Sequence, residues 1–98
     1  MDRIAALLAG IGSTPEEIAL ALRNKSIRGH RGNRFFSNPV VRYLNRHLDI
    51  GGLIEVDQSG SILRVVQYGK VREMSLPAGI SSFLDRFEQG EYRELEEG

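Results

Sequence analysis

The residues with the clearest chemical potential are the arginines of one acid-free segment. Between Ile18 and Leu48 the chain carries seven basic residues and no aspartate or glutamate. Six of these seven are arginine, whose guanidinium group binds phosphate or carboxylate through two parallel hydrogen bonds and stacks on aromatic rings. This composition favours recognition of an anion over a role in solubility alone. The seven basic residues are Arg23, Lys25, Arg28, Arg31, Arg34, Arg42 and Arg46.

Two glycines lie among the arginines of the central stretch, Arg28-Gly29-His30-Arg31-Gly32-Asn33-Arg34. Glycine lets successive backbone amides turn toward an anion, and the neighbouring arginines supply the charge to hold it. The stretch differs from a P-loop, which ends in Gly-Lys-Ser/Thr before a helix, and from a dinucleotide fingerprint, which follows a strand. The pattern indicates a phosphate-binding nest, with a flexible surface loop as the alternative interpretation.

Charge is segregated along the chain although the formal total is zero. Residues 1–17 carry a net charge of −2, residues 18–48 carry +7 and residues 49–98 carry −5. A domain with this distribution has a basic side that suits a polyanion such as nucleic acid. The alternative is a basic side that faces the acidic end of its own chain.

The remaining reactive residues do not form a catalytic or metal-binding pattern. His30 and His47 are seventeen residues apart, and the chain has no cysteine to provide a thiolate ligand. Ser81 and Ser82 fall on the polar side of an expected helix, whereas a nucleophilic serine sits on a sharp turn beside a base. The sequence therefore predicts a non-catalytic module with no cofactor and no metal. Because the absence of cysteine agrees with a reducing compartment, we expect a cytoplasmic protein.

Periodic apolar residues and capping signals predict the first two helices. Ile4, Leu7, Leu8 and Ile11 are spaced as the buried face of a short N-terminal helix. This apolar stretch is too short for a spanning helix or a secretory leader, so we expect no membrane association. A second helix should cover residues 15–24, because Thr14-Pro15-Glu16-Glu17 combines a capping residue, a proline at the first position and a capping-box glutamate.

A loop of about a dozen residues separates this helix from a third one, which should run from about Pro39 to Asp49. The sequence allows two starting positions for this third helix. If Ser37 is the capping residue, Phe36 and Val41 form a hydrophobic staple; if Asn38 is, Pro39 takes the first helical position.

Alternating and β-branched residues predict an antiparallel meander of two or three strands after Gly51-Gly52. A fourth helix should open at Ser75 or at the Leu76-Pro77 step. The expected strands cover residues 53–56, 61–67 and 71–75, and the buried face of the fourth helix comprises Ile80, Phe83, Leu84 and Phe87.

These elements predict a single small α+β domain over residues 1–88, with three N-terminal helices, the meander and a C-terminal helix. Five glutamates lie from Glu88 onward and Arg93 alone opposes them. Residues 89–98 are therefore expected to form an acidic, flexible tail.

The order of three helices and a β-hairpin over residues 3–68 resembles winged helix-turn-helix domains. The third helix, with Arg42-Tyr43-Leu44-Asn45-Arg46-His47, and the strand Leu53-Ile54-Glu55-Val56 after a glycine stop carry the resemblance. In that family the third helix enters the major groove and the hairpin touches the DNA backbone. The resemblance implies that Arg42, Asn45 and Arg46 face base edges or phosphates. The chain departs from the family in its long loop. It also departs from it in Asp57 at the expected wing tip, where a basic residue would be needed to contact a phosphate.

These features predict a binding module that engages a polyanion, with nucleic acid, DNA or RNA, as the leading candidate. The alternative is a protein-interaction module or regulatory subunit whose basic face pairs with an acidic partner or with the Glu-rich end of a second copy. A related prediction is that Glu91, Glu94, Glu96 and Glu97 fold back on the basic segment and weaken nucleic-acid binding. The candidate binding residues are Arg28, Arg31, Arg34, Arg42, Asn45 and Arg46.

Overall fold

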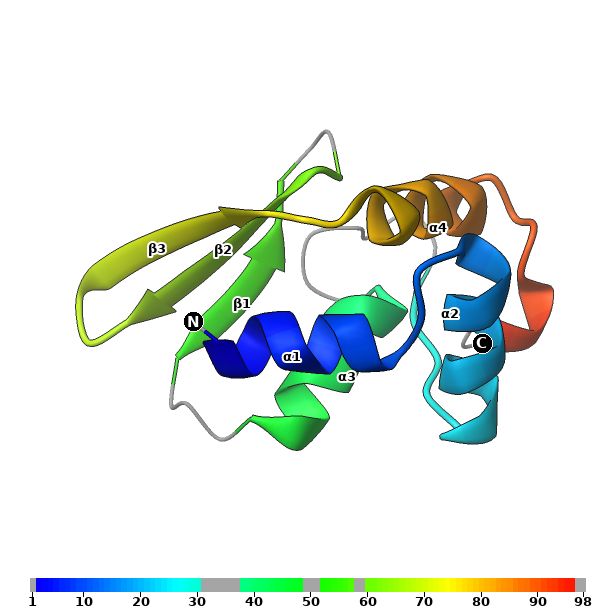
Figure 1. Cartoon of the computed structure of the whole chain (residues 1–98), viewed down its shortest axis with the longest axis horizontal. Helices are drawn as coiled ribbons and strands as arrows, with labels where there is room; N and C mark the ends of the chain where they lie inside the picture. Colours follow the sequence, from blue (N-terminus) through cyan, green and yellow to red (C-terminus); the bar gives the residue numbers. More distant parts are fainter. Residues whose placement is uncertain (1, 31–37, 49–51, 58–59, 97–98) are drawn as a thin grey trace.

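The elements of the chain follow the predicted order of three helices, a meander and a helix (Figure 1). The structure is a computed structural model that describes residues 2–30, 38–48, 52–57 and 60–96. It confirms the α+β fold, with a three-stranded antiparallel sheet in the order β1-β2-β3. The elements are α1 (Asp2–Gly10), α2 (Pro15–Asn24), α3 (Pro39–His47), β1 (Leu53–Val56), β2 (Ile62–Gln67), β3 (Lys70–Ser75), α4 (Ala78–Glu88) and the 3₁₀ helix η1 (Arg93–Leu95).

The capping box at the start of α2 is present. Thr14 Oγ1 accepts a hydrogen bond from the Glu17 amide at 3.2 Å, and Glu17 Oε1 accepts one from the Ser13 amide at 2.9 Å. Hydrogen bonds that the Glu17 carboxylate accepts, from the Ser13 amide and hydroxyl first and from the Thr14 amide next, lower the pKa of Glu17 because they stabilise its ionised form. The predicted span of residues 15–24 is confirmed.

The start of α3 resolves the two alternatives in favour of Asn38. Its Oδ1 accepts a hydrogen bond from the Val41 amide at 2.9 Å, and Pro39 takes the first helical position. The helix ends at His47, and Leu48 follows in an extended conformation. The staple residue Phe36, the alternative cap Ser37 and the expected end at Asp49 lie outside the described residues.

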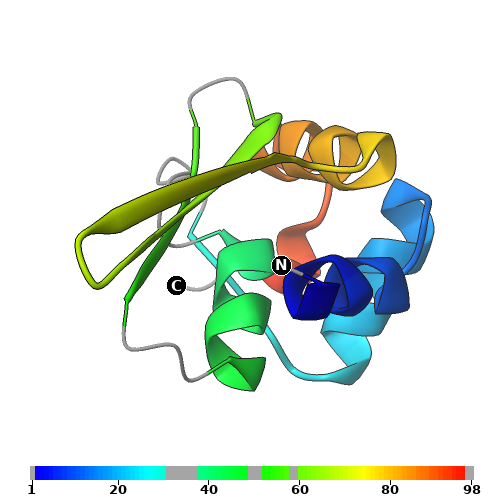
Figure 2. The same ribbon diagram turned by 60° about the vertical axis from the view of Figure 1, so that its left-hand side comes forward.

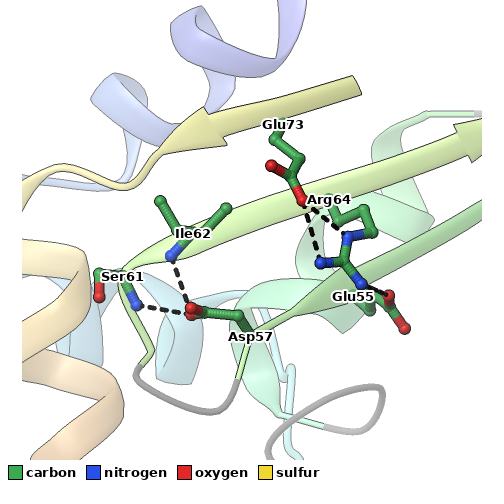
Figure 3. Close-up of polar contacts among 6 residues, drawn as sticks. All are labelled: Glu55, Asp57, Ser61, Ile62, Arg64 and Glu73. Atoms are coloured by element: carbon green, nitrogen blue, oxygen red, sulfur yellow. Dashed lines mark hydrogen bonds and ion pairs between the residues drawn. The ribbon is translucent and has the colours of Figure 1, made fainter. Parts of the chain in front are cut away.

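The sheet turns twice through tight connections. Asp57 closes the β1–β2 turn, since its Oδ1 accepts hydrogen bonds from the amides of Ser61 and Ile62, both at 3.0 Å (Figure 3). Asp57, which is unsuited to a phosphate contact, thus stabilises the turn. At the β2–β3 turn, Tyr68 and Gly69 both adopt positive φ angles, as a two-residue hairpin loop requires.

One face of the sheet packs against the helices and the other faces outward. Ile54, Val56, Leu63 and Val65 are buried on the inner face, while Arg64 on the outer face lies between two carboxylates. Arg64 donates to Glu73 and to Glu55, each at 3.0 Å, and these two partners raise its pKa (Figure 3). The β2–β3 hairpin extends beyond the helices, which leaves β3 largely exposed (Figure 1).

The core is shared by all four helices, β1 and β2. The largest buried side chains include Phe83 and Phe87 of α4, as the predicted helical spacing requires, and each contributes about 1.5–3 kcal/mol by burial. The helix α4 packs against α2. Its Gly79 lies so close to the segment between α1 and α2 that a Cβ on this glycine would stand 2.1 Å from the Ser13 carbonyl oxygen. Figure 2 shows α1 beside α3, where the Tyr43 hydroxyl donates to the Leu7 carbonyl at 3.1 Å.

The C-terminal segment differs from the expected flexible tail. Leu95 is buried in the core, and Tyr92 stacks on Phe83 with 5.2 Å between the ring centroids. The Gly29 amide donates to the Leu95 carbonyl at 2.8 Å, and Gly29 and Glu96 form a parallel β-bridge. The apolar Leu95 among the glutamates provides the burial that holds residues 89–96 on the domain.

Within the described part of the chain, no single helix is long and apolar enough to cross a membrane. The helices α1 and α2 meet those limits only as a pair, bent by 95° at the break between Arg3–Gly10 and Pro15–Asn24.

Candidate anion-binding pocket

The pocket begins at the C-terminal end of α2. The Ser26 amide donates to the Arg23 carbonyl and the Ile27 amide to the Leu22 carbonyl, both at 3.0 Å, which is the Schellman arrangement of helix ends. Ile27 and Leu22 are both buried, as the hydrophobic contact of this motif requires. Ser26 holds the left-handed position, with φ of 58°.

Glycine is the usual residue at that left-handed position, because a Cβ there costs about 1–2 kcal/mol. Ser26 is exposed, and its hydroxyl makes no hydrogen bond with the described residues. The serine therefore accepts backbone strain without a compensating bond inside the part of the chain that the structure describes.

Two arginines of α3 reach across to the backbone that follows α2. Arg46 Nη1 donates to the Lys25 carbonyl at 2.9 Å, and Arg42 Nη1 donates to the Arg28 carbonyl at 3.3 Å. Lys25 is the C-cap of α2, so Arg46 brings its charge to the negative end of the helix dipole. These bonds fix both guanidinium groups against residues 25–28.

The arginines surround a small polar pocket between α3 and the segment that follows α2. The pocket has a volume of about 150 Å³ and opens to solvent. Among the described residues its lining contains no carboxylate, so three like charges lie around one hollow and a bound anion would offset their repulsion. The lining residues are Ser26, Ile27, Arg28, Arg42 and Arg46.

The structure thus brings together three of the six residues predicted as a binding site. Arg28, Arg42 and Arg46 line the same pocket, whereas Asn45 is exposed on α3 and does not line it. Arg31 and Arg34 lie outside the described residues. The prediction of a glycine-rich nest over residues 28–34 also falls mostly on that part of the chain.

Sequence reasoning missed Ser26 and the carbonyl bonds of the two α3 arginines. A polar residue directly after the basic end of a predicted helix is a signal for a C-terminal cap, and it could have directed attention to Ser26. The approach of Arg42 and Arg46 to residues 25–28 depends on how α3 packs, which no local pattern reports.

One glutamate lies close to the same segment. A second hollow of about 80 Å³ is lined by Arg23, Ser26, Ile27, Arg28, Glu94 and Leu95. The β-bridge to Gly29 holds the C-terminal chain in this place. Glu94 is therefore the acidic residue that, among those described, lines this hollow together with Arg23 and Arg28.

Both histidines lie at the surface of the described structure. His30 is exposed, and the His47 ring lies 4.7 Å from the Tyr43 ring, centroid to centroid, on the surface of α3. Burial raises the pKa of the Tyr43 hydroxyl. In the parts of the chain that the structure describes, no three His, Cys, Asp or Glu side chains are grouped to hold a metal ion.

Comparisons of the chain with protein-family models, with curated proteins and with solved structures find no match.

Proposed function

We propose that this domain is a non-catalytic module that binds nucleic acid through the arginine pocket and the basic surface around it. The observation that supports the proposal most directly is the convergence of Arg28, Arg42 and Arg46 on one pocket that no acidic residue of the described chain lines. Three guanidinium groups in such a pocket suit a phosphate better than a neutral ligand, because arginine pairs with phosphate bidentately.

The bonds of Arg42 and Arg46 to backbone carbonyls give the pocket a defined shape before a ligand arrives. A guanidinium group has five N–H donors, and Arg46 gives one of them to the Lys25 carbonyl. Side chains that are already ordered lose less conformational entropy on binding, which increases affinity without new contacts. Arg28 adds an exposed side chain that makes no hydrogen bond or ion pair with the described residues.

The resemblance to winged helix-turn-helix domains supplies one binding mode within this proposal. In that mode α3 lies along the major groove, Asn45 reaches base edges and the pocket arginines hold phosphates. The carbonyl bonds of Arg42 and Arg46 favour phosphate contacts for these two residues over base reading, because a guanidinium held against backbone has less freedom to follow a base edge.

The test is fluorescence anisotropy with labelled single-stranded and duplex DNA and RNA over a salt series. We expect binding that weakens as salt rises, since each phosphate contact releases about one counterion. Arg28→Gln should lower the affinity about three- to tenfold and reduce the salt slope by about one. Arg28 is preferred to Arg42 and Arg46 because its substitution removes no bond to the backbone.

The matched control is Arg72→Gln, which removes one exposed arginine from β3, away from the pocket. Parent and control should bind alike. Absence of binding to all four nucleic acids at low salt, or equal losses in Arg28→Gln and Arg72→Gln, would contradict the proposed site.

A second candidate function, a protein-interaction module, has one observation in its favour. Leu53, Val66 and Val71 lie opposite one another across the three strands on the outer face of the sheet. Leu53 is 44% exposed and Val71 is 59% exposed, so an apolar row faces solvent beside the charged row of Arg64. Rows of this kind are found at protein interfaces.

A further inference from the structure

We infer that the arginine pocket is a site for a single phosphate monoester, the terminal phosphate of a nucleic-acid strand. The inference rests on the proposed function and deepens it, because it names the group that enters the pocket. It is carried by three features of the pocket, which are its serine, its charge and its size.

The first feature is the strained serine. Ser26 occupies a left-handed position where glycine would cost less, and it lines the pocket with an exposed hydroxyl. Strain of this kind persists at binding sites where the side chain has a task. A hydroxyl that can donate a hydrogen bond, next to guanidinium groups, is suited to a phosphate oxygen.

The second feature is the balance of charge. Three arginines and, among the described residues, no carboxylate line the pocket. A phosphate monoester carries about −1.5 to −2 at neutral pH, whereas an internal phosphodiester carries one negative charge. The monoester therefore offsets more of the positive charge, and it also presents three terminal oxygens as acceptors where the diester presents two.

The third feature is the size of the pocket. Its volume is about 150 Å³, and it opens to solvent. The pocket can therefore take a phosphate group while the sugar attached to it stays in solvent.

The decisive experiment compares three oligonucleotides of one sequence, with a 5′-phosphate, with a 3′-phosphate and with hydroxyls at both ends. Anisotropy of an internal label measures the affinity of the full chain for each. We expect at least one phosphorylated form to bind about tenfold more tightly than the hydroxyl form, the effect of one charge-assisted hydrogen bond or more. Inorganic phosphate should remove this advantage and leave the remaining binding in place.

Ser26→Gly is the variant that separates binding from folding. It removes the hydroxyl and also relieves the left-handed strain, so the Tm should be unchanged or higher while the preference for a terminal phosphate falls. Ser26→Ala keeps the strain and removes the hydroxyl, so it should lose the same preference without the gain in Tm. Arg72→Gln again serves as the control and should keep the full preference.

The outcomes distinguish this inference from the proposed function. If the three oligonucleotides bind equally and with a salt dependence, the nucleic-acid function stands and the terminal-phosphate inference is overturned. If none binds, both are overturned. Tighter binding of a phosphorylated peptide than of the phosphorylated oligonucleotides would also overturn the inference, because it would assign the pocket to a protein partner.

Discussion

At the scale of single residues, several polar side chains of this protein form hydrogen bonds to the backbone. Asn38 and Asp57 close a helix start and a turn, and Arg46 and Arg42 hold the segment that follows α2. Their roles combine folding with recognition, because the bonds that stabilise the chain also orient the charges of the pocket. A substitution that tests one of these residues must therefore separate its effect on folding from its effect on binding.

Glu17 provides a pH prediction at this scale. Its pKa is lowered in the folded protein by the bonds from Ser13 and Thr14, so its contribution to stability is present above the pKa of the unfolded chain. The contribution is lost as pH falls through the lower folded pKa. The difference in the free energy of unfolding between the parent and Glu17→Gln should therefore be largest at neutral pH and should shrink below about pH 5.

Urea unfolding at a series of pH values from neutral to acid measures this difference. Glu91→Gln, at an exposed position after α4, is the control with the same change of charge. A difference for Glu17→Gln that does not vary with pH would show that the carboxylate has no special bond in the folded state. Glutamine at this position still suits a capping box, so the variant should fold.

At the scale of elements, the C-terminal segment has two separable roles. Leu95 belongs to the core, while Glu94 lies beside Arg23 and Arg28 at the second hollow. Deletion of residues 89–98 would remove both at once, so a loss of fold would hide any effect on binding. Point substitutions within η1 separate the two roles.

We predict opposite effects for two variants in η1. Leu95→Ala should lower the free energy of unfolding by about 2–4 kcal/mol, because it leaves a cavity in the core. Glu94→Gln should leave stability within about 0.5 kcal/mol and raise nucleic-acid affinity about two- to fivefold at low salt, since one surface charge near the pocket is removed.

Denaturant unfolding and anisotropy measure the two effects. Glu91→Gln is the control on the same segment, and its affinity should stay closer to that of the parent. If Glu94→Gln and Glu91→Gln raise affinity equally, the effect comes from net charge alone and Glu94 has no local influence on the pocket.

At the scale of the whole molecule, the fold brings the acidic C-terminal end of the chain next to the basic segment. The acidic C-terminal chain runs beside the basic segment through the bridge between Gly29 and Glu96. The outer sheet face carries the apolar row of Leu53, Val66 and Val71 on another part of the surface. The two surfaces predict different kinds of association.

Light scattering at low and high salt separates these kinds of association. Self-pairing of basic and acidic surfaces should give an oligomer that dissociates in high salt, whereas pairing through the apolar row should persist. Val71→Lys should abolish the second kind of oligomer and leave the first unchanged. A monomer under both conditions would remove self-association from both surfaces.

The local sequence determined the elements of this protein. The span of α2, the β1 strand and the buried face of α4 follow from capping signals and periodicity, which depend on neighbours within a few residues. Two features were decided by the tertiary structure, namely the burial of Leu95 and the assembly of the arginine pocket. The burial of Leu95 among glutamates depends on the surface that α2 presents, which lies far from it in sequence.

The arginine pocket likewise depends on the tertiary structure. The sequence identified arginine as the binding residue and placed three pocket arginines among its candidates, because side-chain chemistry is a property of single residues. It could not predict that Arg42 and Arg46 would bond to carbonyls 14 and 21 residues away, nor that Ser26 would stand beside them. Those contacts depend on the packing of α3 against the end of α2, which is settled by the whole core.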